Sequence, residues 1–233
     1  MYFIRHFWCS IIEHMRINKL IAQRTGLSRR AADVLIANGQ VSVNGQLATN
    51  GTDVTETDDI SINNTVMPKK PETITIMFNK PPACICSRDG QGAKTIYDYL
   101  PTKYHNLKSV GRLDKNSTGL LLLTNDGQLN QSLSHPKYEK PKIYQVLLDK
   151  PLTDVDRQSL ERGVKLKDGI SQFVLDQLRP DGKAWSVTIY QGRNRQIRRT
   201  FKKLSYIVLK LHRTQFGPYN LGTLPVGEIL VIS

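Results

Sequence analysis

The sequence lacks any apolar run of the roughly 18 residues that a membrane-spanning helix requires, so we expect no integral membrane protein. Cysteine is also scarce. The three cysteines, Cys9, Cys84 and Cys86, are too few and too clustered for a disulfide framework, which indicates a reducing compartment such as the cytoplasm. No second cysteine or histidine pair stands at zinc-like spacing from Cys84 and Cys86, so two small buried side chains are favoured over a metal site there.

Two catalytic patterns are missing as well. The five histidines show no i, i+4 pairing and no carboxylate triad pattern, so zinc hydrolysis and Ser–His chemistry have no support. No glycine-rich loop precedes a helix in the manner of a phosphate-binding loop, which argues against nucleotide-driven chemistry.

Acidic residues are outnumbered. The 233 residues hold 33 lysines and arginines against 20 acids, a net charge of +13. Residues 15–66 carry five basic and five acidic residues, whereas residues 67–233 carry 27 basic and 14 acidic ones, so the excess lies entirely in the second part. Such an excess favours a polyanionic partner, most often nucleic acid, with an anionic membrane surface as the weaker option.

The chain length allows one large domain or two smaller ones, and the pattern favours two. Residues 1–14 are rich in aromatic residues, but Arg5 and His6 interrupt them before a signal-peptide core forms, so we treat this segment as an extension of unknown role. Residues 15–63 resemble a compact module with a first helix that ends at Thr25-Gly26. A second helix is predicted from Arg29 to Asn38, followed by a hairpin at Asn44-Gly45.

Arg29 and Arg30 are unfavourably placed for helix stability, because cations in the first turn face the positive end of the helix dipole. Either the two side chains are solvated and have no functional role, or they bind a phosphate backbone together with the helix N-terminus behind them.

Residues 64–72 contain two prolines and two lysines without periodicity, and we interpret them as a linker. The second domain, residues 73–233, is rich in strands. Alternating or apolar runs predict strands at 73–79, 120–123, 143–148, 185–190 and 207–211, and caps at Thr153 and Asn194 predict two helices that reach Gly163 and about Leu204. The expected fold class is therefore α+β, with a mixed, mainly antiparallel sheet.

Three residues of this domain are candidates for chemistry. Asp114 lies in a polar loop between Gly111 and Gly119 that leads into the apolar run; it either presents a carboxylate to a cleft or caps a turn. Arg198 lies at the margin of the apolar face of a helix in a segment, 190–213, with eight basic residues and no acid. There it either snorkels to solvent or pairs with a carboxylate such as Asp114. Tyr144 is a strand tyrosine, a type that more often belongs to a core.

Three motifs in this order resemble the RsuA-like branch of the rRNA pseudouridine synthases. The first is Gly111-Arg112-Leu113-Asp114 followed by the run 117–127, the second is Lys142-Ile143-Tyr144, and the third is the segment 192–199. Residues 15–63 resemble the alpha-L RNA-binding domain that precedes these enzymes, with 27–32 and Val43-Asn44-Gly45 as its signature. The resemblance covers residues 15–233.

This resemblance implies isomerisation of a uridine in ribosomal RNA to pseudouridine, without a cofactor. It implies that Asp114 is the catalytic carboxylate, that Tyr144 stacks on the uracil, and that Arg198 holds Asp114 ionised and oriented. It also implies that Arg112 fills the space left by the base. The RNA-binding residues that we expect are Arg112, Arg29, Arg30, Arg193, Arg195, Arg199 and Lys202.

The chain departs from the family pattern at three places. Residues 1–14 are extra, Ala83 stands where the family commonly has a glycine, and the end from Gly227 lacks a common arginine. The segment 163–169 resembles the large-subunit members, so 23S rRNA is preferred over 16S rRNA as the substrate. We expect a cytoplasmic monomer that acts on rRNA or a ribosomal precursor. A non-catalytic RNA-binding assembly factor and a membrane-surface protein remain as alternatives.

Overall fold

The computed structural model describes residues 14–68 and 72–232, which form one compact unit up to Glu72 and a second from Thr73. The extension was predicted at 1–14, of which residues 1–13 lie outside the described residues. The linker was predicted at 64–72, of which residues 69–71 lie outside them. In the described part of the chain, no helix is both long and apolar enough to cross a membrane.

The first unit packs two helices against short strands. Helix α1 (Ile17–Thr25) ends at Gly26, whose left-handed backbone (φ 78°) lets its N–H donate to the carbonyl of Ala22. Helix α2 (Arg29–Ala37) begins after Ser28, whose hydroxyl accepts from the N–H of Ala31, as its type and position predict. The strands of this unit are β1 (Met15–Arg16), β2 (Val41–Val43), β3 (Gln46–Leu47), β4 (Asp53–Val54), β5 (Ile60–Ile62) and β6 (Thr65–Val66).

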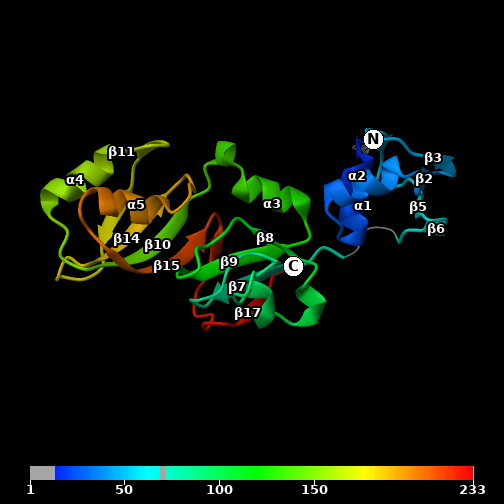
Figure 1. The fold of residues 1–233 in the computed structure, drawn as a ribbon. Helices are drawn as coiled ribbons and strands as arrows, with labels where there is room; N and C mark the ends of the chain where they lie inside the picture. Colours follow the sequence, from blue (N-terminus) through cyan, green and yellow to red (C-terminus); the bar gives the residue numbers. More distant parts are fainter. Residues whose placement is uncertain (1–13, 69–71, 233) are drawn as a thin grey trace, which may run out of the picture. The chain divides into compact units, whose positions relative to one another are not determined.

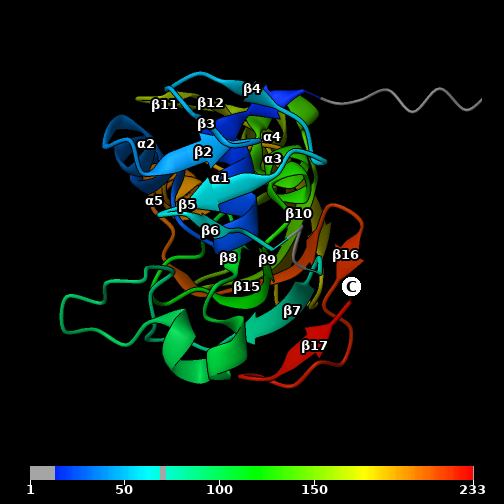
Figure 2. The ribbon, with the colours of Figure 1, turned by 90° about the vertical axis from the view of Figure 1, so that its right-hand side faces the viewer.

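The second unit is built on one twisted sheet with the order β13-β14-β10-β15-β9-β7-β17, in which β8 also pairs with β9 and β16 with β15. Among the described strands of this sheet, only β15 and β9 pair in parallel, so the predicted α+β class with a mainly antiparallel sheet is confirmed. Figure 2 shows β17 beside β7 at one edge. The strands are β7 (Thr75–Lys80), β8 (Lys108–Val110), β9 (Thr118–Thr124), β10 (Lys142–Leu148), β13 (Val174–Gln177), β14 (Ala184–Ile189), β15 (Val208–Phe216), β16 (Tyr219–Asn220) and β17 (Ile229–Val231).

Strand β9 is an interior strand that pairs with β15, β7 and β8. Leu120 to Leu123 are fully buried, which agrees with an apolar run that has no polar face. Leu121 and Leu123 belong to the large core that also includes the short helices η1 (Ile96–Tyr99) and η2 (Thr102–Tyr104). Leu120 and Leu122 pack with Leu133 of α3 (Gly127–Ser134) in a second core.

Helices α4 (Asp154–Arg162) and α5 (Gln196–Lys203) lie along the part of the sheet formed by β10, β14 and β15 (Figure 1). The small hairpin β11 (Val164–Leu166) and β12 (Gly169–Ser171) follows α4. Thr153 caps α4 as predicted, because its hydroxyl accepts from the N–H of Asp156.

One local prediction was wrong, and one helix was missed. Helix α5 does not begin at an Asn194 cap: Arg195 occupies the N-cap position with a left-handed backbone (φ 46°) and no side-chain cap. Helix α3 was not predicted: a strand was expected at 120–123, and no helix was assigned after it. Asp126 in fact caps α3, and its carboxylate accepts from the N–H groups of Gln128 and Leu129.

Candidate active site

Asp114 lies in the turn between β8 and β9, and this turn is fixed from below. The N–H of Ser117 donates to the carbonyl of Asp114 at 3.0 Å. The ammonium of Lys80, fully buried at the end of β7, donates to the carbonyls of Lys115 (3.3 Å), Ser117 (3.0 Å) and Pro81 (3.0 Å). Because a buried ammonium without such acceptors is very unfavourable, these bonds hold the Asp114 turn against β7.

Strand pairing brings the second motif to the same place. Tyr144 of β10 lies opposite Arg213 of β15, and Arg213 lies opposite Gly119 at the start of β9. A Cβ on Gly119 would lie 2.2 Å from the carbonyl oxygen of Arg213, so only glycine permits this approach of the two strands. Tyr144, Arg213 and the Asp114 turn are therefore neighbours although up to 99 residues of sequence separate them.

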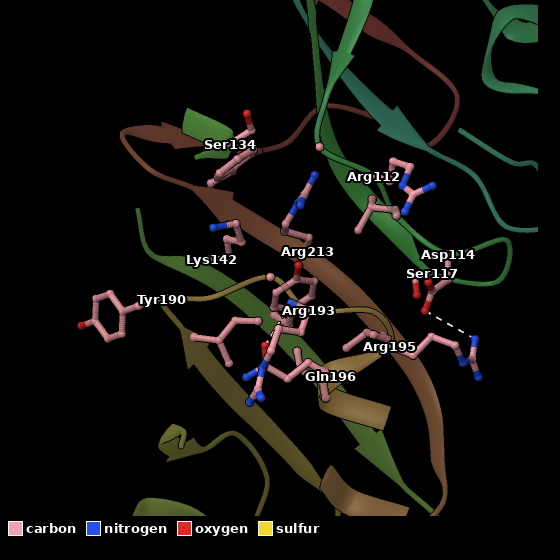
Figure 3. A pocket seen from close by; sticks show the side chains of 18 of the residues that line it. Arg112, Asp114, Ser117, Ser134, Lys142, Tyr190, Arg193, Arg195, Gln196 and Arg213 are labelled. Atoms are coloured by element: carbon pink, nitrogen blue, oxygen red, sulfur yellow. Dashed lines mark hydrogen bonds and ion pairs between the residues drawn. The ribbon is translucent and has the colours of Figure 1, made fainter. Parts of the chain in front are cut away.

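These residues line a cleft of about 160 Å³. An apolar cavity of about 150 Å³ accommodates benzene, so the cleft is the size of one six-membered ring. Figure 3 shows Asp114 and Arg195 on one side of it and Lys142 and Arg213 toward the other. The lining residues are Gly111, Arg112, Leu113, Asp114, Ser117, Ser134, His135, Pro136, Lys142, Tyr144, Ile189, Tyr190, Gly192, Arg193, Arg195, Gln196, Ile197, Leu211, Arg213 and Phe216.

The ion pair of Asp114 differs from the expected one. Its Oδ2 lies 3.4 Å from Nη1 of Arg195, and the two side chains are 29% and 54% exposed (Figure 3). Arg198, the expected partner, donates instead from Nη1 to the carbonyl of Val208 at 2.7 Å and so ties α5 to β15. The cause is the start of α5: Arg195 stands before the helix rather than on its outer face, and its side chain reaches the Asp114 turn.

Arg198 is still coupled electrostatically to this pair. Burial, followed by the positive charge of Arg195, holds the pKa of Arg198 below its ordinary value, and the negative charge of Asp114 acts in the opposite direction. Among the described residues, however, Arg195 is the group that forms an ion pair with Asp114.

Two of the expected RNA-binding arginines are bound within the protein. Asp168, in the turn of the β11–β12 hairpin, accepts from Arg199 at 2.6 and 3.0 Å and from Arg193 at 3.2 Å. The hydrogen bonds from Arg199 hold the pKa of Asp168 below its ordinary value. Arg193 also donates to the carbonyls of Asp168 and Ile170, so both arginines fasten the hairpin to α5.

The other expected RNA-binding residues face solvent. Arg112 is exposed and lines the cleft, and Lys202 is exposed on α5. Arg29 and Arg30 are exposed in the first turn of α2, in the first unit. Their positions leave these four side chains accessible to a polyanion.

Within residues 14–68 and 72–232, no group of three or more His, Cys, Asp or Glu side chains is arranged to hold a metal. Burial raises the pKa of the thiols of Cys84 and Cys86. Cys86 contacts the backbone N–H and carbonyl of Leu113, each at 3.4 Å, and so supports the residue before Asp114.

Sequence reasoning missed Arg213 and Lys142. One signal was present for Arg213: in an alternating strand it falls on the same inward face as Leu211, where a charged residue is unusual. Lys142 was quoted only as a neighbour of Tyr144. Ser117 was also passed over, although its hydroxyl is buried at the cleft without a hydrogen-bond partner.

Comparison with known proteins agrees with this geometry. The family model described as RNA pseudouridylate synthase matches residues 74–203, and the model described as S4 domain matches residues 15–60. A solved structure described as a crystal structure of pseudouridylate synthase superimposes with a TM-score of 0.68 at 31% identity, covering 94% of this chain and 96% of that one.

Relatives with curated names point the same way. The protein named ribosomal large subunit pseudouridine synthase B of Bacillus subtilis is 34% identical over 220 residues, which are 91% of this chain and 90% of the relative. The protein of the same name from Pseudomonas aeruginosa is 35% identical over 216 residues; the match covers 88% of this chain but only 56% of that protein. Ribosomal large subunit pseudouridine synthase E of Vibrio vulnificus is 36% identical over 176 residues.

Proposed function

This chain belongs to the RNA pseudouridylate synthase family, and we propose that it converts a uridine of large-subunit (23S) ribosomal RNA to pseudouridine through the carboxylate of Asp114. The observation that carries the proposal is the position of Asp114: its carboxylate borders a ring-sized cleft that also holds the buried ring of Tyr144 and a cation, Arg195.

The proposed reaction is an isomerisation, so it consumes no second reactant. The bond between N1 of uracil and C1′ of ribose breaks, the base turns, and a bond between C5 and C1′ forms. The proton that C5 loses is balanced by the proton that N1 gains. A carboxylate that acts at the sugar or the base, together with a group that moves one proton, meets these needs, and we assign the first role to Asp114.

Tyr144 is proposed to receive the base. A uridine in a stacked helix is out of reach of Asp114, so the nucleotide has to be flipped into a pocket, at a cost of a few kcal/mol. The ring of Tyr144 is 7% exposed and lines the cleft, and an aromatic face of this kind stacks on an unpaired base.

Cations at both units are proposed to hold the RNA backbone. Arg112 is exposed at the cleft, Lys202 is exposed in the last turn of α5, and Arg29 and Arg30 lie at the N-terminus of α2. Arg195 is half exposed and pairs with Asp114, so it can contact both the carboxylate and the RNA. We propose that Arg198 adds a second positive charge that favours the ionised carboxylate of Asp114, while its hydrogen bond to Val208 ties α5 to β15. Arg193 and Arg199 are proposed to act mainly by fixing the β11–β12 hairpin.

The large-subunit preference is supported by the names of the relatives, which are large-subunit enzymes in each case reported above. We propose that the chain acts as a monomer on 23S rRNA or its precursor, in the cytoplasm, and that the reaction uses no cofactor.

The test is pseudouridine mapping by carbodiimide modification and primer extension on 23S and 16S transcripts incubated with the purified chain. We expect one modified 23S position with the wild type and none with Asp114→Asn. The matched control is Asp176→Asn, because Asp176 is an exposed acid on β13 outside the cleft lining.

Other outcomes separate the alternatives. A modified position only in 16S rRNA would retain the activity and refute the 23S preference. RNA binding by the wild type with no modification in either transcript would favour a non-catalytic assembly factor.

A further inference from the structure

Arg213 is a buried cation that the proposed chemistry does not use. Its side chain is 2% exposed, Nε donates to the carbonyl of Leu120 at 2.7 Å, and Nη2 is buried without a hydrogen-bond partner. Its guanidinium lies between two rings, with Cζ 4.8 Å from the centre of Phe216 and 6.0 Å from that of Tyr144. Buried guanidinium groups are normally paired with an acid, and an unpaired one is destabilising.

A second cation lies beside Arg213 in the same end of the cleft. The ammonium of Lys142 donates to the carbonyl of Lys140 at 3.0 Å and lies 4.9 Å from the centre of the Phe216 ring. Burial, followed by the charge of Arg213, lowers the pKa of Lys142 to about 8, so the two cations repel each other in a partly desolvated place. The imidazole of His135 lines the same cleft.

No acid offsets these charges locally. Among the described residues that line the cleft, Asp114 is the only acid, and it is paired with Arg195. Figure 3 places Arg213 and Lys142 toward the side of Ser134, away from the Asp114–Arg195 pair.

We propose that Arg213 and Lys142 form a subsite for a backbone phosphate of the flipped nucleotide, with the phosphate oxygens accepting from Nη2 of Arg213 and Nζ of Lys142. The proposal rests on the proposed function, since it takes the ligand to be an RNA nucleotide whose base lies at Tyr144.

Charge favours a phosphate over a carbonyl group of the base at this end. A neutral uracil carbonyl needs a hydrogen-bond donor but no positive charge. A phosphodiester is negatively charged, so it supplies the counter-charge that is missing beside Arg213 and Lys142. The arrangement also separates the tasks: Asp114 and Lys142 lie on different sides of the cleft (Figure 3), and Tyr144, which lines the same cleft, receives the base.

The experiment measures dissociation constants of uridine 5′-monophosphate and of uridine for the full chain, by heteronuclear NMR titration at pH 7. The chains compared are the wild type, Arg213→Gln, Arg213→Lys, Lys142→Met and the control Lys210→Met. Lys210 is an exposed lysine three residues before Arg213 on β15, so its loss removes the same charge from the same strand outside the cleft lining.

We expect the wild type and Lys210→Met to bind the nucleotide at least tenfold more tightly than the nucleoside. This preference falls below threefold in Lys142→Met and Arg213→Gln and is partly restored in Arg213→Lys. If Arg213→Gln does not fold, as judged by its circular dichroism, Lys142→Met and Arg213→Lys still decide the question.

Equal affinity of the wild type for nucleotide and nucleoside would overturn the proposal, and so would a preference that survives in Lys142→Met. Pseudouridine mapping with the wild type is scored separately. A chain that modifies rRNA but shows no nucleotide preference has the proposed function without this subsite, whereas a preference without any modification refutes the proposed function alone.

Discussion

Replacing Gly119 by alanine tests the contact on which the cleft depends. Gly119 has a φ of 101°, and a Cβ there would lie 2.2 Å from the carbonyl oxygen and 2.6 Å from the nitrogen of Arg213. Both atoms belong to the backbone of β15, which cannot turn aside as a flexible side chain would. The parallel pairing of β9 with β15, which places Arg213 opposite Gly119, would have to open.

Two costs combine in this substitution. Holding alanine in a sparsely populated backbone region costs about 1–3 kcal/mol. Overpacking against a fixed neighbour costs about another 1–3 kcal/mol. We therefore expect Gly119→Ala to lower the free energy of unfolding by about 2–6 kcal/mol, a large fraction of the roughly 5–15 kcal/mol of a typical domain.

Urea denaturation followed by the fluorescence of Trp185 measures this loss, because Trp185 is buried in the core of the second unit. A Trp8→Phe background removes the other tryptophan. The control is Gly127→Ala at the start of α3, where a Cβ would meet nothing within 4 Å and alanine is favoured by up to about 1 kcal/mol. A Gly119→Ala chain within about 1 kcal/mol of the wild type would refute the reasoning.

Three further predictions follow from local geometry. Ala83 has a left-handed backbone (φ 63°), so Ala83→Gly should raise the free energy of unfolding by about 1–2 kcal/mol in the same assay. The pKa of Lys142 in the folded chain, about 8, lies below the ordinary value of 10.5, so the unfolded chain binds more protons between these two pH values. The free energy of unfolding of the wild type, relative to that of Lys142→Met, should therefore rise with pH in this window. A fall would contradict the prediction. The pKa of Asp168 is lowered, so its stabilising effect should be present above pH 3.8 and be lost as the pH falls below that value. The melting temperature of Asp168→Asn should lack this part of the pH dependence. If the melting temperatures of the wild type and of Asp168→Asn fell equally in acid, the stabilising pair with Arg199 would be contradicted.

The prediction of the fold succeeded where one local signal dominates. The fully apolar run at 120–123, bounded by Gly119, suits a strand buried on both faces, and Ser28 and Thr153 are hydroxyl caps at helix starts. Where two signals compete, the sequence is ambiguous: Asp126 before Gly127 suits both a turn and a helix cap. Ala83 illustrates a third case, since the family comparison pointed to a glycine there and the positive φ shows why glycine is favoured.

Side-chain partners at the candidate site were harder to predict, because they depend on the residue at which α5 begins. If α5 began after Asn194, Arg195 would lie on the outer face and Arg198 would be the arginine nearest the sheet. In the structure Arg195 is the N-cap residue, outside the regular helix, and its side chain reaches the Asp114 turn. Arg198 keeps its place beside the apolar face of α5, but there it donates to the carbonyl of Val208 in β15.

Arg213 belongs to a different kind of difficulty, because its position follows from three strands that lie far apart in the sequence. Gly119, Tyr144 and Arg213 stand in one row only after β9, β15 and β10 have paired, and no local pattern specifies that register. In this row, Gly119, at the start of β9 next to the Asp114 turn, lies opposite Arg213, whose Nη2 has no hydrogen-bond partner. The missing counter-charge of Arg213 therefore gives information about the ligand that the sequence does not contain. That a buried guanidinium has no acidic partner can be seen only when all of its neighbours in the folded chain are known.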